Sequence, residues 1–242
     1  MRTGELIGSG LDADVYAIDE SWVLRRTRDR RSQHREAAVM AHLHAHGYPV
    51  PEIRPSDNAE DLVMRRAAGP TLLEAAFAGD LDTDRVGAIL AELLVRLHAV
   101  PVQDEKDEKH REDREEGKDG QTGNGDQPGG PATAILHLDL HPMNVILTAD
   151  GPVVIDWTNT RQDQPNLDWA MSALILAQVA LNGSDLSPAA DDLLTALLAH
   201  RPPAVVLDAA VMARAHAQRA DNPHDVHDHL DEAVALVIAR AG

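Results

Sequence analysis

Apolar and polar residues follow two different patterns along the chain. Short apolar runs of the strand type, separated by Gly, Asp and Ser, fill most of the first 66 residues and predict five strands. These runs lie at 5–10, 13–19, 21–27, 51–56 and 60–66. Between the third and fourth runs, residues 32–47 have helical spacing, with Ser32 as the candidate N-cap and Gly47 as the stop signal.

Helical spacing dominates the rest of the chain. In residues 83–100 the apolar side chains recur on one helix face at i, i+3, i+4, i+7, i+8 and i+11. These side chains are Val86, Ile89, Leu90, Leu93, Leu94 and Leu97. Further helices are predicted at 167–181, 188–200, 203–220 and 226–239. The order predicts an α+β fold with two lobes, a small β-rich N-lobe at 1–66 and a larger helical C-lobe at 67–242.

One segment of the C-lobe shows neither pattern. Residues 103–130 contain no apolar side chain. Ordering them would cost about 1–2 kcal/mol per residue in backbone entropy, with no apolar surface buried in return. Doubling the length of a surface loop costs only about 0.6 kcal/mol, so a fold tolerates such an insertion. We therefore expect a disordered insertion, and docking of a partner protein on it stays open.

Polar residues gather where two apolar runs meet, in the stretch ILHLDLHPMNVIL and the later run VVIDW. The spacing His137-x-Asp139-x4-Asn144, followed by Asp156, is typical of a kinase catalytic loop and its metal-binding aspartate. Asp139 can accept or orient the proton of an acceptor hydroxyl. Asn144 and Asp156 offer the hard oxygen ligands that Mg²⁺ prefers. The runs NVIL and VVID predict a hairpin that fixes both ligands on rigid strands.

Two weaker signals precede this motif. Gly8, Gly10 and Ala13 have the spacing of a G-x-G-x-x-G loop, but the loop joins two predicted strands, which disfavours a Rossmann dinucleotide site. Such a strand-turn-strand can instead cover nucleotide phosphates. Arg25, on the third strand, could reach phosphates, and Glu36 in the next helix could hold it. A surface Arg and a surface Glu remain the alternative for this pair.

Together these motifs resemble the aminoglycoside phosphotransferase/choline kinase family of small-molecule kinases, which have a protein-kinase-like fold. HLDLHPMNVIL and VIDW resemble its H-x-D-L-H-P-x-N and I-D-W motifs, while REAAVMAHLHAHGYPVPEI and LVMRRAAGPTL resemble its helix after the third strand and its hinge. The resemblance covers nearly the whole chain. It implies that ATP, with GTP as the alternative, and Mg²⁺ bind between the lobes. A γ-phosphoryl group would then pass to a hydroxyl of a small molecule.

The resemblance also implies roles for single residues. Asp139 would be the catalytic base, Asn144 and Asp156 the Mg²⁺ ligands, and His141 would approach the transferring phosphate. Asp168 would buttress the site. The implied nucleotide contacts are Gly8, Ser9, Gly10, Val15, Val23, Arg25, Glu36, Met64, Arg65 and Ala67. Within this set, Met64 is the gatekeeper, and the Arg65 carbonyl and the Ala67 amide would contact adenine at a hinge near 65–69.

Two positions depart from the family pattern. Ala13 replaces the third Gly of the loop, and Arg25 stands where protein kinases use Lys. All three lysines of the chain, Lys106, Lys109 and Lys118, lie in the segment 103–130. The rest of the chain, which we expect to be folded, contains Arg but no Lys, so Arg25 fits a general preference for Arg over Lys. Arg still offers a charged fork to phosphate. A nucleotide-binding pseudokinase or regulatory module remains the rival hypothesis.

Charge and composition restrict the kinds of molecule that the protein is expected to bind. The net charge of −18 argues against nucleic acid and anionic membrane. Residues 1–66 carry 11 acids and 10 bases, so the excess acid lies in the C-lobe, where this fold places the acceptor. A cationic acceptor such as an aminoglycoside or another amino-bearing antibiotic is therefore favoured. Amino sugars, choline-like amines, neutral sugars and macrolides stay open, although only six aromatic residues disfavour a cage for a quaternary ammonium.

Several function classes are disfavoured by what the sequence lacks. It has no cysteine, which excludes disulfides, thiolate nucleophiles and Cys-based zinc sites. It shows no Walker A motif, nucleophile elbow or H-E-x-x-H motif. No signal peptide or membrane span is predicted, so we expect a cytoplasmic monomer or weak dimer. The histidines His224, His227 and His229 could bind a metal, but a solvated helix start is the favoured interpretation.

Overall fold

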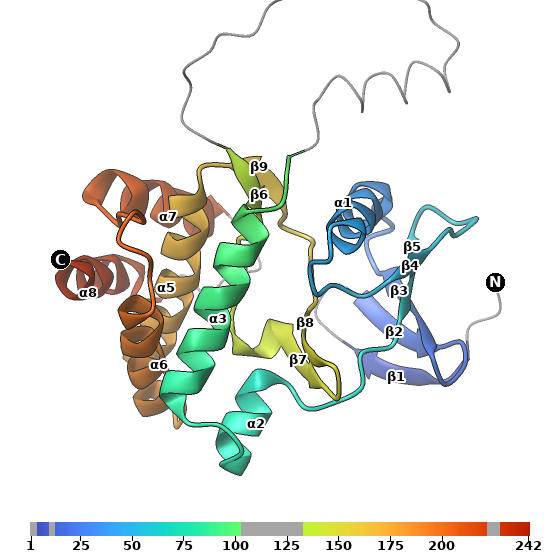
Figure 1. Cartoon of the computed structure of the whole chain (residues 1–242), viewed down its shortest axis with the longest axis horizontal. Coiled ribbons are helices and arrows are strands. Elements are labelled where there is room, and N and C mark those ends of the chain that lie inside the picture. The colour runs from blue at the N-terminus through green and yellow to red at the C-terminus, as the bar shows by residue number, and fades with distance from the viewer. Residues whose placement is uncertain (1–3, 10–12, 103–132, 222–227) are drawn as a thin grey trace, which may run out of the picture.

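The computed structural model describes residues 4–9, 13–102, 133–221 and 228–242 (Figure 1). The predicted insertion at 103–130, Gly10, His224 and His227 lie outside these residues. The described part forms an antiparallel sheet with one helix at the N-terminal end and a group of helices at the C-terminal end (Figure 1). The predicted two-lobed α+β arrangement is confirmed.

All five predicted strands of the N-lobe form and share one antiparallel sheet. The strands are β1 (Leu6–Ser9), β2 (Ala13–Ala17), β3 (Trp22–Thr27), β4 (Ile53–Arg54) and β5 (Asp61–Arg65), and their order in the sheet is β1-β2-β3-β5-β4. Because side chains alternate between the two faces of a strand, Val23 and Arg25 share one face of β3, and Trp22 and Leu24 share the other. The face of Val23 and Arg25 is the one that lines the cleft between the lobes.

Helix α1 (His34–Ala45) follows β3 and ends as predicted. Gly47 has a φ of 73°, which a residue with a side chain rarely adopts, and marks the stop. The predicted N-cap is wrong by one residue, because the cap position is Gln33. The backbone N–H of Gln33 donates to the Ala59 carbonyl at 2.7 Å, which ties the chain to the loop before β5 and fixes where the helix begins. The Ser32 hydroxyl still accepts a hydrogen bond from the His34 amide at 3.3 Å.

The C-lobe is built around one buried helix. Its described helices are α2 (Leu72–Ala78), α3 (Thr83–His98), α5 (Pro165–Leu181), α6 (Ser187–Ala199), α7 (Ala209–Asp221) and α8 (Leu230–Ala241). Helix α5 is buried on nearly every side because α6, α7 and α8 pack around it. Helices α3 and α6 approach closely at Gly87, where an added Cβ would lie 2.5 Å from the Cβ of Ala196. The apolar face predicted for α3 is buried throughout.

Two predicted helices begin later than expected, and one helix was not predicted. The helix expected at 226–239 begins at Leu230, and residues 228 and 229 are not helical. Residues 203–208 are not helical, and α7 begins at Ala209, where the Asp208 carboxylate accepts from the Val211 amide as an N-terminal cap does. Helix α2 was not predicted. Its signal was present as a capping box, in which Thr71 and Glu74 exchange side-chain and backbone hydrogen bonds. Among the described residues, no helix is long and apolar enough to cross a bilayer.

Two short pairs of strands carry the polar motif of the C-lobe. Strand β6 (Ala134–Leu136) pairs with β9 (Arg161–Asp163), and β7 (Val145–Thr148) pairs with β8 (Gly151–Val154) as the predicted hairpin. The expectation that strands hold both metal ligands is wrong in detail. Asn144 ends a short 3-10 turn, η1 (Pro142–Asn144), just before β7, and Asp156 lies two residues beyond β8 with a φ of 63°.

Candidate active site

A cleft of about 660 Å³ lies between the sheet and the β7–β8 hairpin. Nine of the residues predicted for the site line it, namely Val15, Val23, Arg25, Glu36, Met64, Arg65, Ala67, Asp139 and Asp156. Asn144 and His141 lie next to Asp139. Of the predicted glycine-rich loop, Gly8 and Ser9 are described and are not among the lining residues, and Ser9 donates to Asp14 at 2.9 Å.

One part of the cleft is apolar. Val15 and Val23 come from the sheet, Ile146 comes from β7, and Ile155 directly follows β8. Sequence reasoning missed Ile146 and Ile155, although both lie in the apolar runs that flank the catalytic motif. Their signal was the alternation along β7 and along β8 with the residue after it, which turns every second side chain to the same face. The result is an apolar part of the cleft that residues of both lobes line.

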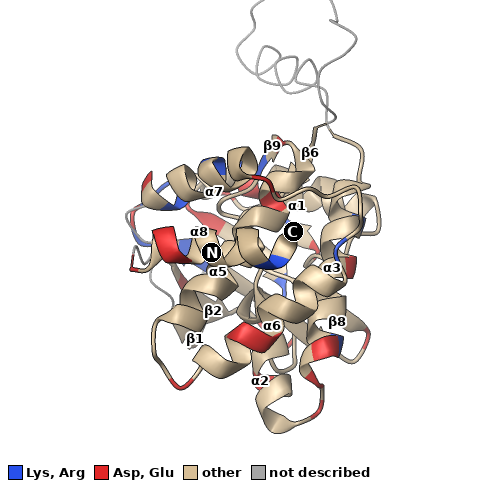
Figure 2. Ribbon diagram, turned by 90° about the vertical axis from the view of Figure 1, so that its left-hand side faces the viewer, with Lys and Arg blue, Asp and Glu red and all other residues tan. Residues whose placement is uncertain are grey.

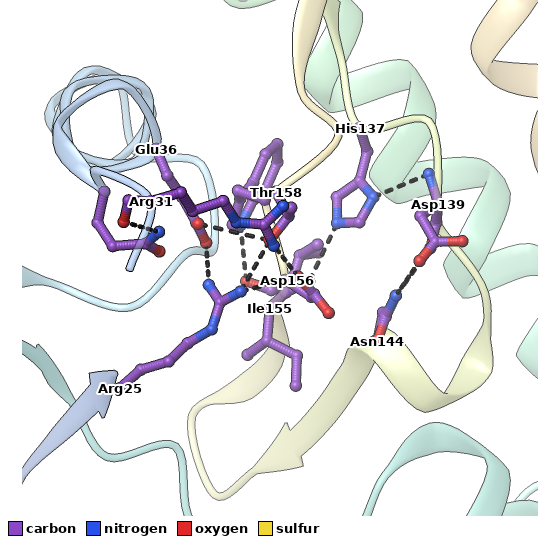
Figure 3. A network of polar contacts seen from close by, with 12 residues as sticks. Arg25, Arg31, Glu36, His137, Asp139, Asn144, Ile155, Asp156 and Thr158 are labelled. Carbon is purple, nitrogen blue, oxygen red and sulfur yellow. Dashed lines mark hydrogen bonds and ion pairs between the residues drawn. The ribbon is translucent and has the colours of Figure 1, made fainter. Parts of the chain in front are cut away.

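The charged part of the cleft centres on Arg25, which joins both lobes (Figure 3). One guanidinium nitrogen of Arg25 forms an ion pair with Glu36 of α1. The other donates to the Thr158 hydroxyl at 2.7 Å and lies 3.4 Å from Oδ1 of Asp156. We call Arg25, Glu36, Asp156 and Thr158 the Arg25 cluster. Burial raises the pKa of Glu36, and the positive charge of Arg25 opposes that rise.

Arg31 is a second arginine in the cleft that sequence reasoning missed. It lies in the loop between β3 and α1, and Figure 3 shows its guanidinium pointing toward Thr158. The Arg31 carbonyl accepts hydrogen bonds from the side chains of Thr27 at 3.1 Å and Gln33 at 3.4 Å. Arg30, with a φ of 58°, makes the turn just before it. These contacts fix the backbone from which Arg31 reaches the cleft.

The candidate catalytic base is oriented by Asn144. The Asn144 side-chain nitrogen donates to the Asp139 carbonyl at 2.9 Å and to Oδ2 of Asp139 at 3.2 Å. With the nitrogen turned to Asp139, the amide oxygen Oδ1 is the atom that Asn144 can offer to a cation. His141 lies 3.9 Å from Oδ2 of Asp139. Burial and the neighbouring His137 lower the pKa of His141 to about 4, so its imidazole is neutral at pH 7.

A buried Asp168 holds the backbone of the catalytic loop (137–144) in place. Its Oδ2 accepts from the His137 amide at 3.0 Å, and its Oδ1 accepts from the Leu138 amide at 2.7 Å. His98 of α3 contacts Oδ2 at 3.0 Å. Burial raises the pKa of Asp168, but the hydrogen bond and charge of His98 and the hydrogen bond from the His137 amide together outweigh it, and the net shift is downward. Leu138 has a φ of 66°, a strained conformation that these two bonds stabilise.

His137 links the catalytic loop to the segment that carries Asp156. Its Nε2 lies 3.0 Å from the Ile155 carbonyl, and its Nδ1 accepts from the Asp139 amide at 3.2 Å. These partners assign the proton to Nε2, because a carbonyl can only accept and an amide can only donate. Burial lowers the pKa of His137, which fits a neutral ring.

The residues present fit a magnesium ion bound together with phosphates. Asn144 and Asp156 supply an amide oxygen and a carboxylate, and nearly half of the Asp156 side chain is exposed to the cleft. Mg²⁺ prefers such hard ligands and is usually held by few protein groups plus substrate phosphates. In the part of the chain that the structure describes, no group of three or more His, Cys, Asp or Glu side chains could hold a metal by itself.

The sequence matches one known family. Residues 3–128, slightly more than half of the chain, match the phosphotransferase enzyme family. The match ends before His137, so the roles of the catalytic loop rest on its own motif and geometry. Among curated proteins, no relative matches.

Solved structures with a similar fold cover nearly the whole chain. A choline/ethanolamine kinase family protein from Mesorhizobium loti aligns with a TM-score of 0.52 at 16% identity, over 98% of this chain and 87% of that chain. The ADP-bound aminoglycoside phosphotransferase APH(2'')-Ib aligns with a TM-score of 0.54 at 16% identity, over 99% and 94%. APH(2")-IIa, in a ternary complex with streptomycin and ATP, aligns with a TM-score of 0.55 at 18% identity, over 97% and 86%.

At these identities the structural likeness shows the fold alone, and the sequence match supplies the family. Both the fold and the family agree with the resemblance of the motifs HLDLHPMNVIL and VIDW. The chain belongs to the phosphotransferase enzyme family and has its two-lobed, protein-kinase-like fold.

Proposed function

We propose that the protein transfers the γ-phosphoryl group of ATP to a hydroxyl of a small molecule. The observation that carries the proposal is that Asp139 and Asp156 of the C-lobe line the same cleft as Arg25 of the N-lobe. A kinase needs this combination, because a base must face the acceptor while charged groups hold the phosphates between the lobes.

The nucleotide would lie across the cleft from its apolar to its charged part. Val15 and Val23 would cover the base, with Ile146 and Ile155 below it. Met64 would be the gatekeeper, and the Arg65 carbonyl and the Ala67 amide would contact adenine. Arg25, held by Glu36, would bind the α- and β-phosphates. GTP remains the alternative to ATP.

The reaction requires one proton acceptor near the incoming hydroxyl. As the acceptor oxygen bonds to the γ-phosphorus, the bond from that phosphorus to the β,γ-bridging oxygen breaks, ADP leaves, and Asp139 takes the hydroxyl proton. Asn144 holds Oδ2 of Asp139 and so orients the carboxylate. Neutral His141 can donate a hydrogen bond to the transferring phosphate. Asp139 would contribute a factor of about 10²–10⁴ as a base.

Mg²⁺, when bound, would neutralise charge on the β- and γ-phosphates. Asn144 Oδ1 and the Asp156 carboxylate are the groups that would hold it. The positive φ of Asp156 turns this residue out of the line of β8, and its side chain lies at the cleft.

We further propose that the acceptor carries amino groups, as an aminoglycoside does. The support is the acidic C-lobe, and Figure 2 shows its Asp and Glu residues spread over several helices and loops. The electrostatic field of these acidic residues attracts cations in general without selecting one. One acid of β9 contributes little to it, because Asp163 is bound by Arg214 at 2.8 Å through both oxygens.

The test is ADP release with ATP and Mg²⁺ against a panel of aminoglycosides, peptide antibiotics, amino sugars, choline and neutral sugars. Asp139→Asn is the control for the base. Asp150→Asn, an exposed residue of the β7–β8 turn, is the control for the loss of one charge. We expect an amino-bearing acceptor to be phosphorylated by wild type and by Asp150→Asn, and about 10²–10⁴-fold more slowly by Asp139→Asn.

A nucleotide-binding pseudokinase is the rival from another class. It predicts that ATP stabilises the protein against heat while no member of the panel releases ADP above background. Equal turnover by wild type and Asp139→Asn would contradict the proposed role of Asp139.

A further inference from the structure

The hydroxyl of Thr158 lies between the three charged side chains of the Arg25 cluster (Figure 3). It accepts a hydrogen bond from Arg25 at 2.7 Å and donates to Oδ1 of Asp156 at 2.9 Å. A third contact, to Oε2 of Glu36, measures 3.5 Å. Thr158 is two residues beyond Asp156 in sequence, yet it touches two residues of the N-lobe.

A hydroxyl has only one proton, so these contacts compete. The N–H of Arg25 can only donate, which makes the Thr158 oxygen the acceptor there. The single proton of Thr158 must then go to Asp156 or to Glu36. At 2.9 Å against 3.5 Å it goes to Asp156 in this structure, and a rotation about the Cβ–Oγ bond would turn it toward Glu36.

The hydroxyl also separates charges that would otherwise meet. Arg25 lies 3.4 Å from Oδ1 of Asp156, close enough for an ion pair but longer than a strong charged hydrogen bond. Without the Thr158 oxygen, the guanidinium would have Asp156 as its remaining partner on that side. A tight Arg25–Asp156 pair would occupy the carboxylate that the proposed function assigns to the cation, and the arginine that it assigns to the phosphates.

We propose that Thr158 is a positioning residue that couples the cation-binding carboxylate of Asp156 to the Arg25–Glu36 pair. Its hydroxyl holds Arg25 toward Glu36 and donates to Asp156. When Asp156 gives Oδ1 to a divalent cation, the proton turns to Glu36. This inference rests on the proposed function, since it concerns the same nucleotide and cation.

The test measures binding rather than turnover. The dissociation constant of ADP is determined by calorimetry with and without Mg²⁺ for wild type, Thr158→Val and Thr158→Ser. The dissociation constant without Mg²⁺ divided by the constant with Mg²⁺ gives a ratio that reports how strongly the cation and the nucleotide are coupled. We expect the ratio to fall about tenfold in Thr158→Val, the factor for one lost hydrogen bond to a charged group, and to be retained in Thr158→Ser.

Thr160→Val is the matched control, because it makes the same change in the same segment. The Thr160 hydroxyl donates to the Leu136 carbonyl at 2.8 Å and not to the Arg25 cluster. This variant should lower the melting temperature and leave the ratio unchanged. Melting temperatures without ligand show whether Thr158→Val is folded, and Thr158→Ser tests the hydroxyl if it is not.

Two outcomes would overturn the inference. The first is that Thr158→Val folds and has the same ratio as wild type. The second is that the ratio falls in Thr158→Ser as much as it falls in Thr158→Val. Failure of the proposed function looks different. Absence of turnover with wild-type ADP and Mg²⁺ binding would contradict the phosphotransfer alone, whereas a wild type that binds no ADP or shows no effect of Mg²⁺ would overturn the inference as well.

Discussion

The catalytic loop and the Arg25 cluster lie at the same cleft, yet they are held in different ways. In the catalytic loop, Asp168 binds two backbone amides, and His137 binds one amide and one carbonyl. The Arg25 cluster depends on charged side chains that meet across the two lobes. The loop therefore moves only if backbone bonds break, whereas the cluster can rearrange by side-chain rotation. We expect substitutions in the loop to reduce stability and turnover together, and substitutions in the cluster to act mainly on ligand binding.

The largest effect is expected for Asp168→Asn. The amide group has one acceptor oxygen in place of two, and its nitrogen cannot accept from the amides of His137 and Leu138. Leaving buried donors unpaired should lower the free energy of unfolding by about 3 kcal/mol and reduce kcat as the loop loosens. Urea unfolding and steady-state kinetics check this.

Asp163→Asn is the matched control for Asp168→Asn. Asp163 lies in the same lobe, but it accepts only one backbone amide, that of its neighbour Gln164 at 2.7 Å, and its ion-pair partners Arg161 and Arg214 are partly exposed. The control should lose about 1 kcal/mol or less. Equal losses in the two variants would show that the buried bonds of Asp168 to the loop backbone contribute no more to stability than a partly exposed ion pair.

In the Arg25 cluster, Arg25→Lys should weaken ADP binding about tenfold and change the free energy of unfolding little. An ammonium keeps the charge but lacks the fork with which Arg25 binds Glu36 and Thr158 at the same time. Calorimetric titration with ADP measures the effect.

Arg26→Lys separates ligand binding from stability, because Arg26 lies on the opposite face of the same strand. It binds both oxygens of Asp61 at 2.6 Å and does not line the cleft. The change should lower stability slightly and leave ADP affinity intact. If Arg26→Lys weakened ADP binding as much as Arg25→Lys, the cluster would have no special role.

The two regions also differ in how far the sequence could predict them. The residues of the catalytic loop are neighbours in the chain, so spacing alone brought Asp139 and Asn144 together. Short apolar runs separated by turn residues likewise predicted five strands in the N-lobe, and all five form. Thr158 and Arg31 could not be found this way, because their partners are set by how α1 and the segment after β8 meet in space. Nothing in the residue types of a Thr and a loop Arg distinguishes them from surface residues.

Local signals were read correctly where they were strong and missed where they were short. The face of α3 repeats over three turns and its burial is confirmed. Helix α2 has only seven residues, too few for a clear helical repeat, so its capping box was its only signal in the sequence. The start of α1 was misplaced because a tertiary hydrogen bond from Gln33 to Ala59, invisible in the sequence, decides it.

A smaller effect on ligand binding is expected for Arg31→Met. Arg31 is partly exposed and its charge is screened, so its loss should weaken ADP binding about threefold to tenfold without changing the melting temperature. Arg35→Met, an exposed arginine of α1 that does not line the cleft, makes the same charge change. Identical affinities of the two variants would show that Arg31 acts only through the general charge of the N-lobe.

The smallest effect concerns pH and belongs to the catalytic loop alone. His137 is buried and neutral, so its pKa in the folded protein lies below the 6.5 of an exposed histidine. Asp168, the hydrogen bond to the Ile155 carbonyl and Asp156 all favour its protonation, but burial outweighs them and the pKa is lowered. Between pH 6.5 and the folded pKa, the unfolded chain binds a proton at this position that the folded chain does not. Stability is therefore complete above pH 6.5 and falls as the pH decreases, by at most about 1.4 kcal/mol per pH unit for this one group.

His137→Asn isolates that contribution, because asparagine does not titrate. The variant should be less stable than wild type at pH 7.5, because it loses the buried hydrogen bonds of His137, and the difference in free energy of unfolding should shrink as the pH is lowered to 5.5. Urea unfolding at pH 7.5, 6.5 and 5.5 measures it. In the Arg25 cluster burial raises the pKa of Glu36, but lysine keeps the positive charge that opposes this rise, so Arg25→Lys should keep a nearly constant difference from wild type over this range. A difference that stays constant for His137→Asn as well would mean that His137 is not held neutral, and the contrast in pH response between the two regions would disappear.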